Sequence, residues 1–145
     1  MRYVRFLRFL SAALALLAIA FTALPVSALD LNPGEREAIA AVIQKQFDAF
    51  ARDDGEAAFA QAAPEIRKMF GEADAFMRMV RQAYGPVYHH REAAFADIKD
   101  GPTQIVTITG EDGRHWLAFY QMVLGEDGIW RIKGCNLIED PDQHA

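Results

Sequence analysis

The sequence predicts an α+β protein in which N-terminal helices pack on a four-stranded antiparallel sheet. Apolar residues recur every three or four positions between residues 35 and 84, as on one face of a helix. From residue 87 onward they recur at every second position, as in a strand. Two Glu-Asp-Gly turns, at 111–113 and 126–128, divide this second region into short strands. Helices followed by a meander of strands are typical of the α+β class.

The first 28 residues have the pattern of a secretory signal peptide. Three arginines among the first eight residues precede an apolar run from 9 to 24, and the small residues Val26 and Ala28 stand at positions −3 and −1 of a cleavage site. We therefore expect cleavage after Ala28 and a periplasmic or secreted protein. The alternative is an uncleaved membrane anchor, for which the apolar run falls short of the ~20 residues that span a bilayer.

The remaining chain is predicted to be one α+β domain, residues 29–138, followed by a flexible polar tail, residues 139–145. The chain of 145 residues has a formal net charge of −5, and loss of the leader with its three arginines leaves −8. Because so acidic a protein repels phosphate groups, neither nucleic acid nor, after cleavage of the leader, an anionic membrane is an expected partner.

The helical region begins with a capping signal. Asn32 can accept hydrogen bonds from the free amides of a helix N-terminus, Pro33 suits the first turn, and Glu35 stands three residues after the cap. The apolar stripe that follows is interrupted by one polar residue, Gln46. We expect helices at about 35–52, 56–62, 64–70 and 72–84, the last of them ended by the Gly-Pro pair that follows.

Strands are expected at 87–98, 103–109, 114–124 and 129–138. If each Glu-Asp-Gly is a three-residue loop with a glycine bulge, the even-numbered positions share one face, and because this face is the more apolar we assign it to the helices. A four-residue loop would shift the pairing by one and mix the faces. The predicted inner face comprises Val106, Ile108, Trp116, Ala118, Tyr120, Met122, Leu124, Trp130, Ile132, Gly134, Asn136 and Ile138.

The opposite face of the predicted sheet is also apolar. An exposed apolar patch of such size usually marks a partner surface, so we expect a homodimer formed through this outer sheet face. The alternative is that another segment of the same chain covers it. The predicted patch comprises Leu117, Phe119, Val123, Ile129 and Leu137.

The order of these elements resembles a known family. The stretches "FDAFARDDGEAAFAQAAPEIRKMFG", "FMRMVRQAYGPVY" and "GIWRIKGCNL" are similar to a family of small exported bacterial proteins known as a domain of unknown function. The long first helix, its acidic break and the final "DGIWRI" strand resemble the nuclear transport factor two-like, or cystatin-like, fold. This resemblance implies a cone in which helices close over a curved sheet around a concave pocket, and it implies no particular chemistry.

The expected cone gives a set of candidate pocket-wall residues. Ligand pockets combine apolar and aromatic area with a few hydrogen-bonding groups. Tyr84 and Tyr88 flank the predicted corner from helix to strand, where they could close the mouth of the pocket. The alternative for each residue is ordinary core packing. The predicted ligand-binding residues are Tyr84, Tyr88, Trp116, Tyr120, Trp130 and Asn136.

The sequence indicates no catalytic residue, no metal site and no cofactor. His89 and His90 would point to opposite faces of a strand, so they cannot bind one metal ion together, and His115 is the one other histidine before the tail. No nucleophile elbow or phosphate-binding loop occurs. The single cysteine, Cys135, cannot form a disulfide within its own chain, and we expect it to be a small buried residue of a strand. A reactive thiol or an intermolecular disulfide is the alternative.

Together these features predict a non-catalytic module that binds an apolar small molecule or a peptide segment, or that acts in assembly. The alternative is an enzyme of the isomerase or hydratase type, with a carboxylate or histidine at the pocket mouth and Tyr84 or Tyr120 as proton donor. A carboxylate buried within hydrogen-bond reach of a tyrosine hydroxyl would favour the enzyme. An apolar interior would favour binding.

Overall fold

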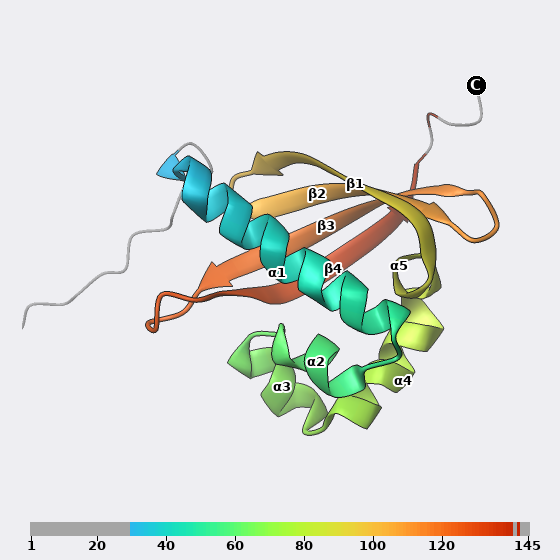
Figure 1. Cartoon of the computed structure of the whole chain (residues 1–145), viewed down its shortest axis with the longest axis horizontal. Coiled ribbons are helices and arrows are strands. Elements are labelled where there is room, and N and C mark those ends of the chain that lie inside the picture. The colour runs from blue at the N-terminus through green and yellow to red at the C-terminus, as the bar shows by residue number, and fades with distance from the viewer. Residues whose placement is uncertain (1–29, 141, 143–145) are drawn as a thin grey trace, which may run out of the picture.

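The computed structural model of the chain describes residues 30–140 and 142 (Figure 1). The predicted signal peptide and most of the predicted tail lie outside these residues. The described part has the predicted α+β class, with helices followed by strands. The elements are α1 (Pro33–Ala51), α2 (Gly55–Ala60), α3 (Pro64–Phe70), α4 (Ala73–Ala83), α5 (Gly85–Tyr88), β1 (His90–Lys99), β2 (Thr103–Gly110), β3 (His115–Leu124) and β4 (Trp130–Glu139).

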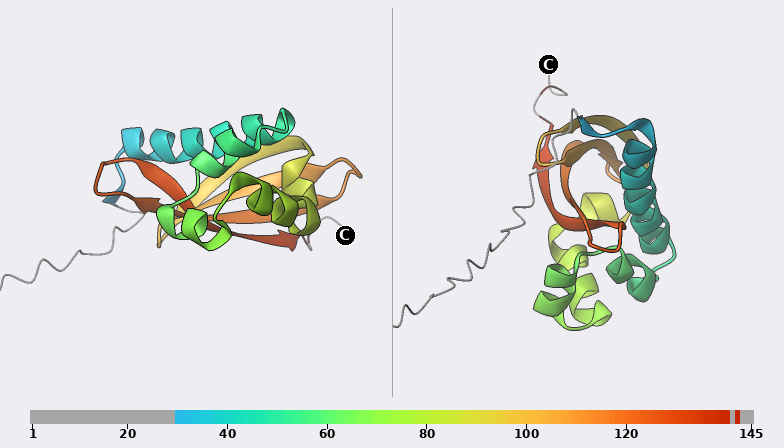
Figure 2. Two further views of the ribbon diagram at one scale, coloured as in Figure 1. Left: turned by 90° about the horizontal axis from the view of Figure 1, so that it is seen from below. Right: turned by 90° about the vertical axis from the view of Figure 1, so that its left-hand side faces the viewer.

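The strands form one antiparallel sheet in the order β1-β2-β3-β4. Helix α1 lies across one face of this sheet, and α2 and α3 lie beside β4 (Figure 1). The sheet curls toward α1, so that the helices and the sheet enclose a common core (Figure 2). None of the described helices combines the length and apolar character that crossing a bilayer requires.

Helix α1 begins at the predicted capping signal. The Asn32 side chain accepts a hydrogen bond from the Glu35 amide at 3.0 Å, and the Glu35 carboxylate accepts one from the Asn32 amide at 2.9 Å. This reciprocal pair satisfies two amides that would otherwise lack a partner at the helix start. The buried stripe of α1 runs from Ile39 to Phe50 and includes the predicted polar interruption, Gln46.

The link between α2 and α3 is joined to the free edge of β4. The Ile132 amide donates to the Gln61 carbonyl at 2.9 Å, and the Ala63 amide donates to the Ile132 carbonyl at 2.8 Å. Helix α3 starts directly after this link at Pro64 and ends at Gly71, whose φ of 76° suits glycine. The edge of the sheet is therefore covered, and α3 is held over it.

The corner between helices and sheet differs from the prediction. The segment Gly85–Tyr88 forms a short fifth helix, α5, and β1 starts at His90 rather than at residue 87. Pro86 stands in the first turn of α5, where its missing amide costs no hydrogen bond. The glycine-proline pair thus ends α4, as predicted, but it also begins α5, which includes the first two residues of the predicted strand.

The two Glu-Asp-Gly turns are three-residue hairpin loops, as predicted. In each loop the glycine has a positive φ, 80° at Gly113 and 74° at Gly128. In each, the aspartate side chain accepts from a backbone amide two residues later, Asp112 from Arg114 at 3.0 Å and Asp127 from Ile129 at 3.1 Å. The aspartate and the glycine therefore fix the loop geometry together.

A bulge in β4 corrects the predicted faces of the last strand. Gln121 pairs with Gly134 whereas the next residue, Met122, pairs with Ile132, so Lys133 is an extra residue in β4. Positions after Lys133 change faces as a result. The side chains of Cys135 and Leu137 pack toward the helices, and the predicted inner residues Gly134, Asn136 and Ile138 belong to the outer face.

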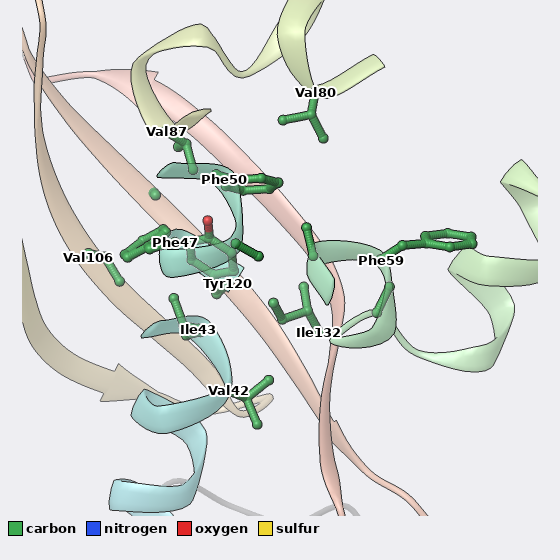
Figure 3. Close-up of a cluster of buried hydrophobic side chains, with 14 of the residues drawn as sticks. Val42, Ile43, Phe47, Phe50, Phe59, Val80, Val87, Val106, Tyr120 and Ile132 are labelled. Carbon is green, nitrogen blue, oxygen red and sulfur yellow. The ribbon is translucent and has the colours of Figure 1, made fainter. Parts of the chain in front are cut away.

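The core lies between α1 and the sheet and extends to α2, α4 and α5. Phe47 and Phe50 of α1 point toward Tyr120 of β3, and Val87 of α5 lies close by (Figure 3). The Phe47 and Tyr120 rings meet edge to face, with centroids 6.0 Å apart. Strand residues of the predicted inner face that are buried are Val106, Ile108, Ala118, Tyr120, Met122, Trp130 and Ile132.

Candidate functional site

An apolar cavity of about 330 Å³ lies between the helices and strands β3 and β4. Its volume is at the lower end of the range of small-molecule sites, roughly 300–1,000 Å³. Met69 of α3, 71% exposed, lies at its mouth. The lining comprises Gln46, Phe50, Ala62, Ile66, Met69, Phe70, Phe76, Met79, Val80, Tyr84, Val87, Tyr120, Gln121, Ile132, Gly134, Cys135 and Asn136.

Helices α3 and α4 form most of the outer wall of the cavity, and the residues they contribute are uncharged. Helix α3 contributes Ile66, Met69 and Phe70, and none of its residues is buried. Helix α4 has a strongly amphipathic sequence, and its apolar side supplies Met79 and Val80. The helical wall thus combines methionines with aliphatic and aromatic side chains. Because methionine side chains are flexible, such a wall can adapt to ligands of varied shape.

Tyr84 connects the end of α4 to the bulged strand. Its hydroxyl donates a hydrogen bond of 2.7 Å to the carbonyl oxygen of Cys135. Burial, with a smaller electrostatic contribution from Cys135, raises the pKa of Tyr84 above its ordinary value. The hydroxyl therefore remains protonated at neutral pH, and its hydrogen is engaged in the bond to the Cys135 carbonyl.

Cys135 and Tyr120 form a second polar pair in the cavity wall. The buried Tyr120 hydroxyl lies beside the Cys135 thiol and interacts with it, and the thiol donates a hydrogen bond of 3.8 Å to the Asn136 carbonyl oxygen. Burial raises the pKa of the Cys135 thiol to about 12, although the hydrogen bond from Tyr120 opposes part of this shift. Burial likewise raises the pKa of Tyr120 well above its usual range. The thiol is therefore protonated and a poor nucleophile, as a structural cysteine is.

Gln46 is the one buried side-chain amide among the described lining residues, at 4% exposure. Its Nε2 donates to the carbonyl oxygen of Ala58 in α2 at 3.3 Å. Within the described residues, no donor faces its Oε1. The amide therefore connects α1 to α2 through one end and leaves an acceptor at the cavity.

Three of the six predicted ligand-binding residues border this cavity, namely Tyr84, Tyr120 and Asn136. Asn136 pairs with Phe119, so its side chain is directed away from the helices. Trp130 is 5% exposed and is a core residue outside the lining. The indole nitrogen of Trp116 is buried with no hydrogen-bond partner among the described residues, and its ring packs under Arg114 at 4.9 Å.

Tyr88, the remaining predicted residue, belongs to a separate cleft of about 340 Å³ between α1 and the corner at α5. Its ring stacks on His89 at 4.1 Å, and Arg81 lies 5.8 Å from its centre. His90 contacts Phe47 instead, with ring centroids 4.8 Å apart. No group of three or more His, Cys, Asp or Glu side chains in the described part is arranged to hold a metal ion.

The helical half of the cavity wall was not predicted from the sequence. Ile66, Met69 and Met79 were visible only as apolar positions of short helices, and nothing local shows that α3 faces the sheet. Gln46 gave a usable signal, because it is the single polar residue in an otherwise apolar stripe. A polar residue at a buried position requires a hydrogen-bond partner, and that partner can be a ligand.

Fold and site together define an α+β protein with an apolar cavity whose described lining is uncharged. Residues 33–145 match the model of a family described as a domain of unknown function, DUF4864. The chain belongs to this family. No match to the chain was found among the curated proteins or among the solved structures.

Proposed function

We propose that this protein binds a small apolar molecule in the cavity between α3, α4 and β4. The observation that carries the proposal is an opening of about 330 Å³ whose described lining contains no charged side chain and a single buried side-chain amide. Apolar pockets with a few placed polar groups are the usual form of small-molecule sites. A cavity of this volume accommodates one side chain of a peptide better than a peptide segment, so a small molecule is the preferred ligand.

An isomerase or hydratase reaction is the less favoured function. The cavity lining of the described chain includes no carboxylate and no histidine that could act as a general base. The hydroxyls of Tyr84 and Tyr120 have raised pKa values and stay protonated, and both interact with Cys135. Residues that could act as a general base line the separate cleft at α5, namely Asp48, Glu111, His89 and His90.

Methionine methyl groups provide an internal test of ligand binding. Met69 and Met79 line the cavity, whereas Met77 and Met122 are core residues outside the lining. We expect titration with 2-octanone, an uncharged probe without a hydrogen-bond donor, to shift the ¹³C-methyl resonances of Met69 and Met79 in a saturable way. The resonances of Met77 and Met122 should move little. Shifts of all four, or of none, would contradict binding in this cavity.

A pair of variants on one helix separates blocking of the cavity from general damage. Met79→Trp places a large ring in the cavity, so it should abolish the probe-induced shift at Met69. Arg78→Trp makes the same substitution at an exposed neighbouring position outside the lining, so it should leave the shift unchanged. Equal effects of the two substitutions would mean that the probe binds elsewhere.

A homodimer formed through the outer sheet face is a second part of the proposal. Three residues of the predicted patch lie half-buried on that face, namely Leu117, Phe119 and Val123. Because of the bulge in β4, Leu137 faces the helices and Ile138, which is 48% exposed, takes its place in the patch. The four side chains carry no charge, so two acidic copies can meet there with little repulsion. Light scattering after size exclusion should give twice the chain mass, and Phe119→Asp should give the monomer mass. A monomer at high concentration of the wild type would contradict the dimer.

Export with removal of residues 1–28 completes the proposal, with the periplasm or the exterior as the site of action. The basic start, the apolar run and the small residues before position 29 support it. Mass spectrometry of the exported protein should find Leu29 as the first residue. Ala28→Trp should leave the leader attached, because a large residue at position −1 blocks cleavage. An intact leader in the wild type would contradict cleavage.

A further inference from the structure

We propose that the cavity selects an uncharged ligand whose hydroxyl group hydrogen-bonds to the side-chain amide of Gln46. This inference rests on the proposed function, since it specifies the ligand of the same cavity. The volume of about 330 Å³ sets the size of that ligand. Sites of this volume lie at the lower end of the range for small molecules, so a ligand with a single short chain or ring fits better than a large one.

The described lining disfavours burial of a charged group. None of its residues is a lysine, arginine, histidine, aspartate or glutamate, and its one thiol stays protonated. A carboxylate or ammonium group would enter the cavity without a counter-ion, which costs far more free energy than the entry of a neutral polar group. Fatty acids and amines are therefore disfavoured relative to neutral molecules of the same length.

Gln46 supplies the polar contact for a neutral ligand. Its bond from Nε2 to the Ala58 carbonyl fixes the orientation of the amide, because an oxygen at that place would face another oxygen. The Oε1 atom is left without a donor inside a side chain that is 4% exposed. Oε1 is not among the fully buried side-chain atoms that lack a partner, so it is open to the cavity, and a ligand that fills the cavity without donating to it leaves this acceptor unpaired.

The other polar side chains of the lining are either engaged with the protein or directed to the outer face of the sheet. The Tyr84 hydroxyl donates to the Cys135 carbonyl, and the buried Tyr120 hydroxyl interacts with the Cys135 thiol. Gln121 and Asn136 lie on the outer face by their register. Gln46 thus offers one free acceptor and one remaining N–H. A hydroxyl group, which both donates and accepts, matches this pair, whereas a ketone can only accept.

The test compares two probes with the same carbon skeleton, 2-octanol and 2-octanone, together with the anion octanoate. Affinities are measured for the folded mature chain from the Met69 and Met79 methyl shifts. We expect 2-octanol to bind about fivefold more tightly than 2-octanone, the effect of one net hydrogen bond, and octanoate to bind most weakly. The side-chain NH₂ resonances of Gln46 should move with 2-octanol and less with 2-octanone.

Two variants of α1 assign the preference to one residue. Gln46→Leu should reduce the ratio between the two affinities to about one, and Gln44→Leu, at an exposed position of α1, should keep the wild-type ratio. Equal affinities in the wild type, a preference for octanoate, or a ratio that survives Gln46→Leu would overturn the inference while the cavity still binds. Failure of all three probes to bind would overturn the proposed function itself. If Gln46→Leu does not fold, the wild-type ratio and the Gln46 resonances decide.

Discussion

At the scale of single residues, burial determines the chemistry of the polar groups in this cavity. Cys135 shows this most clearly: the sequence leaves a reactive thiol open as the alternative to a small buried residue, and in the structure the side chain packs toward the helices with a raised pKa. Its burial raises the pKa to about 12, and the hydrogen bond from Tyr120 recovers only part of the shift. The position of the residue relative to the bulge, and not its neighbours in sequence, produces this environment.

The thiol of Cys135 should therefore react slowly. With a pKa near 12 in place of 9, the thiolate population at pH 8 falls by a factor on the order of 100 or more. We expect the folded protein to react with a chromogenic disulfide reagent at least about 100-fold more slowly than the urea-unfolded protein. The unfolded chain is the control for reagent and label. A folded-state rate close to the unfolded one would mean that the thiol is accessible and ionised.

The Tyr84 hydroxyl should contribute measurably to stability. Tyr84→Phe removes a hydrogen bond of 2.7 Å to the Cys135 carbonyl and leaves that carbonyl without this donor. The expected loss in free energy of unfolding is about 1 kcal/mol, measured by urea denaturation. Tyr88→Phe is the matched control, since no hydrogen bond of the Tyr88 hydroxyl is found in the described part, and it should change stability less. Equal losses would show that Tyr84 acts through ring packing alone.

At the scale of elements, local sequence rules predicted most of the helices and strands. The cap at Asn32 and the glycines at 113 and 128 act on residues within four positions, so their effects can be read without knowledge of the fold. The bulge at Lys133 depends on two partners of β4 that are distant in sequence, Gln121 in β3 and the link at Ala62. Gly134 was the available signal, because glycine inside a strand often marks a bulge.

Helix α3 should be the most mobile wall of the cavity. It has seven residues, none of them buried, and it ends at Gly71. So short a helix has little stability of its own. We expect its amides to exchange hydrogen faster than those of α1 between Ile39 and Phe50, and a bound ligand to slow the exchange in α3 while α1 changes little. Amide exchange followed by NMR measures both. Protection of α3 equal to that of α1 in the free protein would contradict a mobile wall.

At the scale of the whole molecule, the element order could be predicted but the site could be predicted only in part. Tyr84 and Tyr120 border the cavity, as expected of aromatic residues at the helix-to-strand corner and on the inner face of the sheet. Trp130 was expected in the cavity wall but is a core residue outside the lining. An aromatic residue on the inner face of a sheet has the same sequence pattern in either position. The assignment of α3 to the cavity wall required the contact of its preceding link with Ile132, which joins segments about seventy residues apart in the chain.

The same buried groups make the stability of the whole protein sensitive to alkaline pH. The Cys135 thiol ionises near 9 in the unfolded chain and at about 12 in the folded one, so between these values the unfolded state releases a proton that the folded state keeps. The contribution of this thiol to the free energy of unfolding is therefore fully present below pH 9 and is lost as the pH rises toward 12. The raised pKa values of Tyr84 and Tyr120 add a loss in the same direction above pH 10.

Urea unfolding between pH 7 and pH 11 should therefore show a decline that starts near pH 9. Cys135→Ser keeps a group that can pair with Tyr120 and does not titrate in this range, so its stability should stay nearly constant from pH 8 to pH 10 and fall only where the tyrosines ionise. The difference between the two curves measures the burial of the thiol in the intact fold. Parallel curves for wild type and variant would mean that Cys135 has the same pKa in both states, and that the bulge does not place it against the helices.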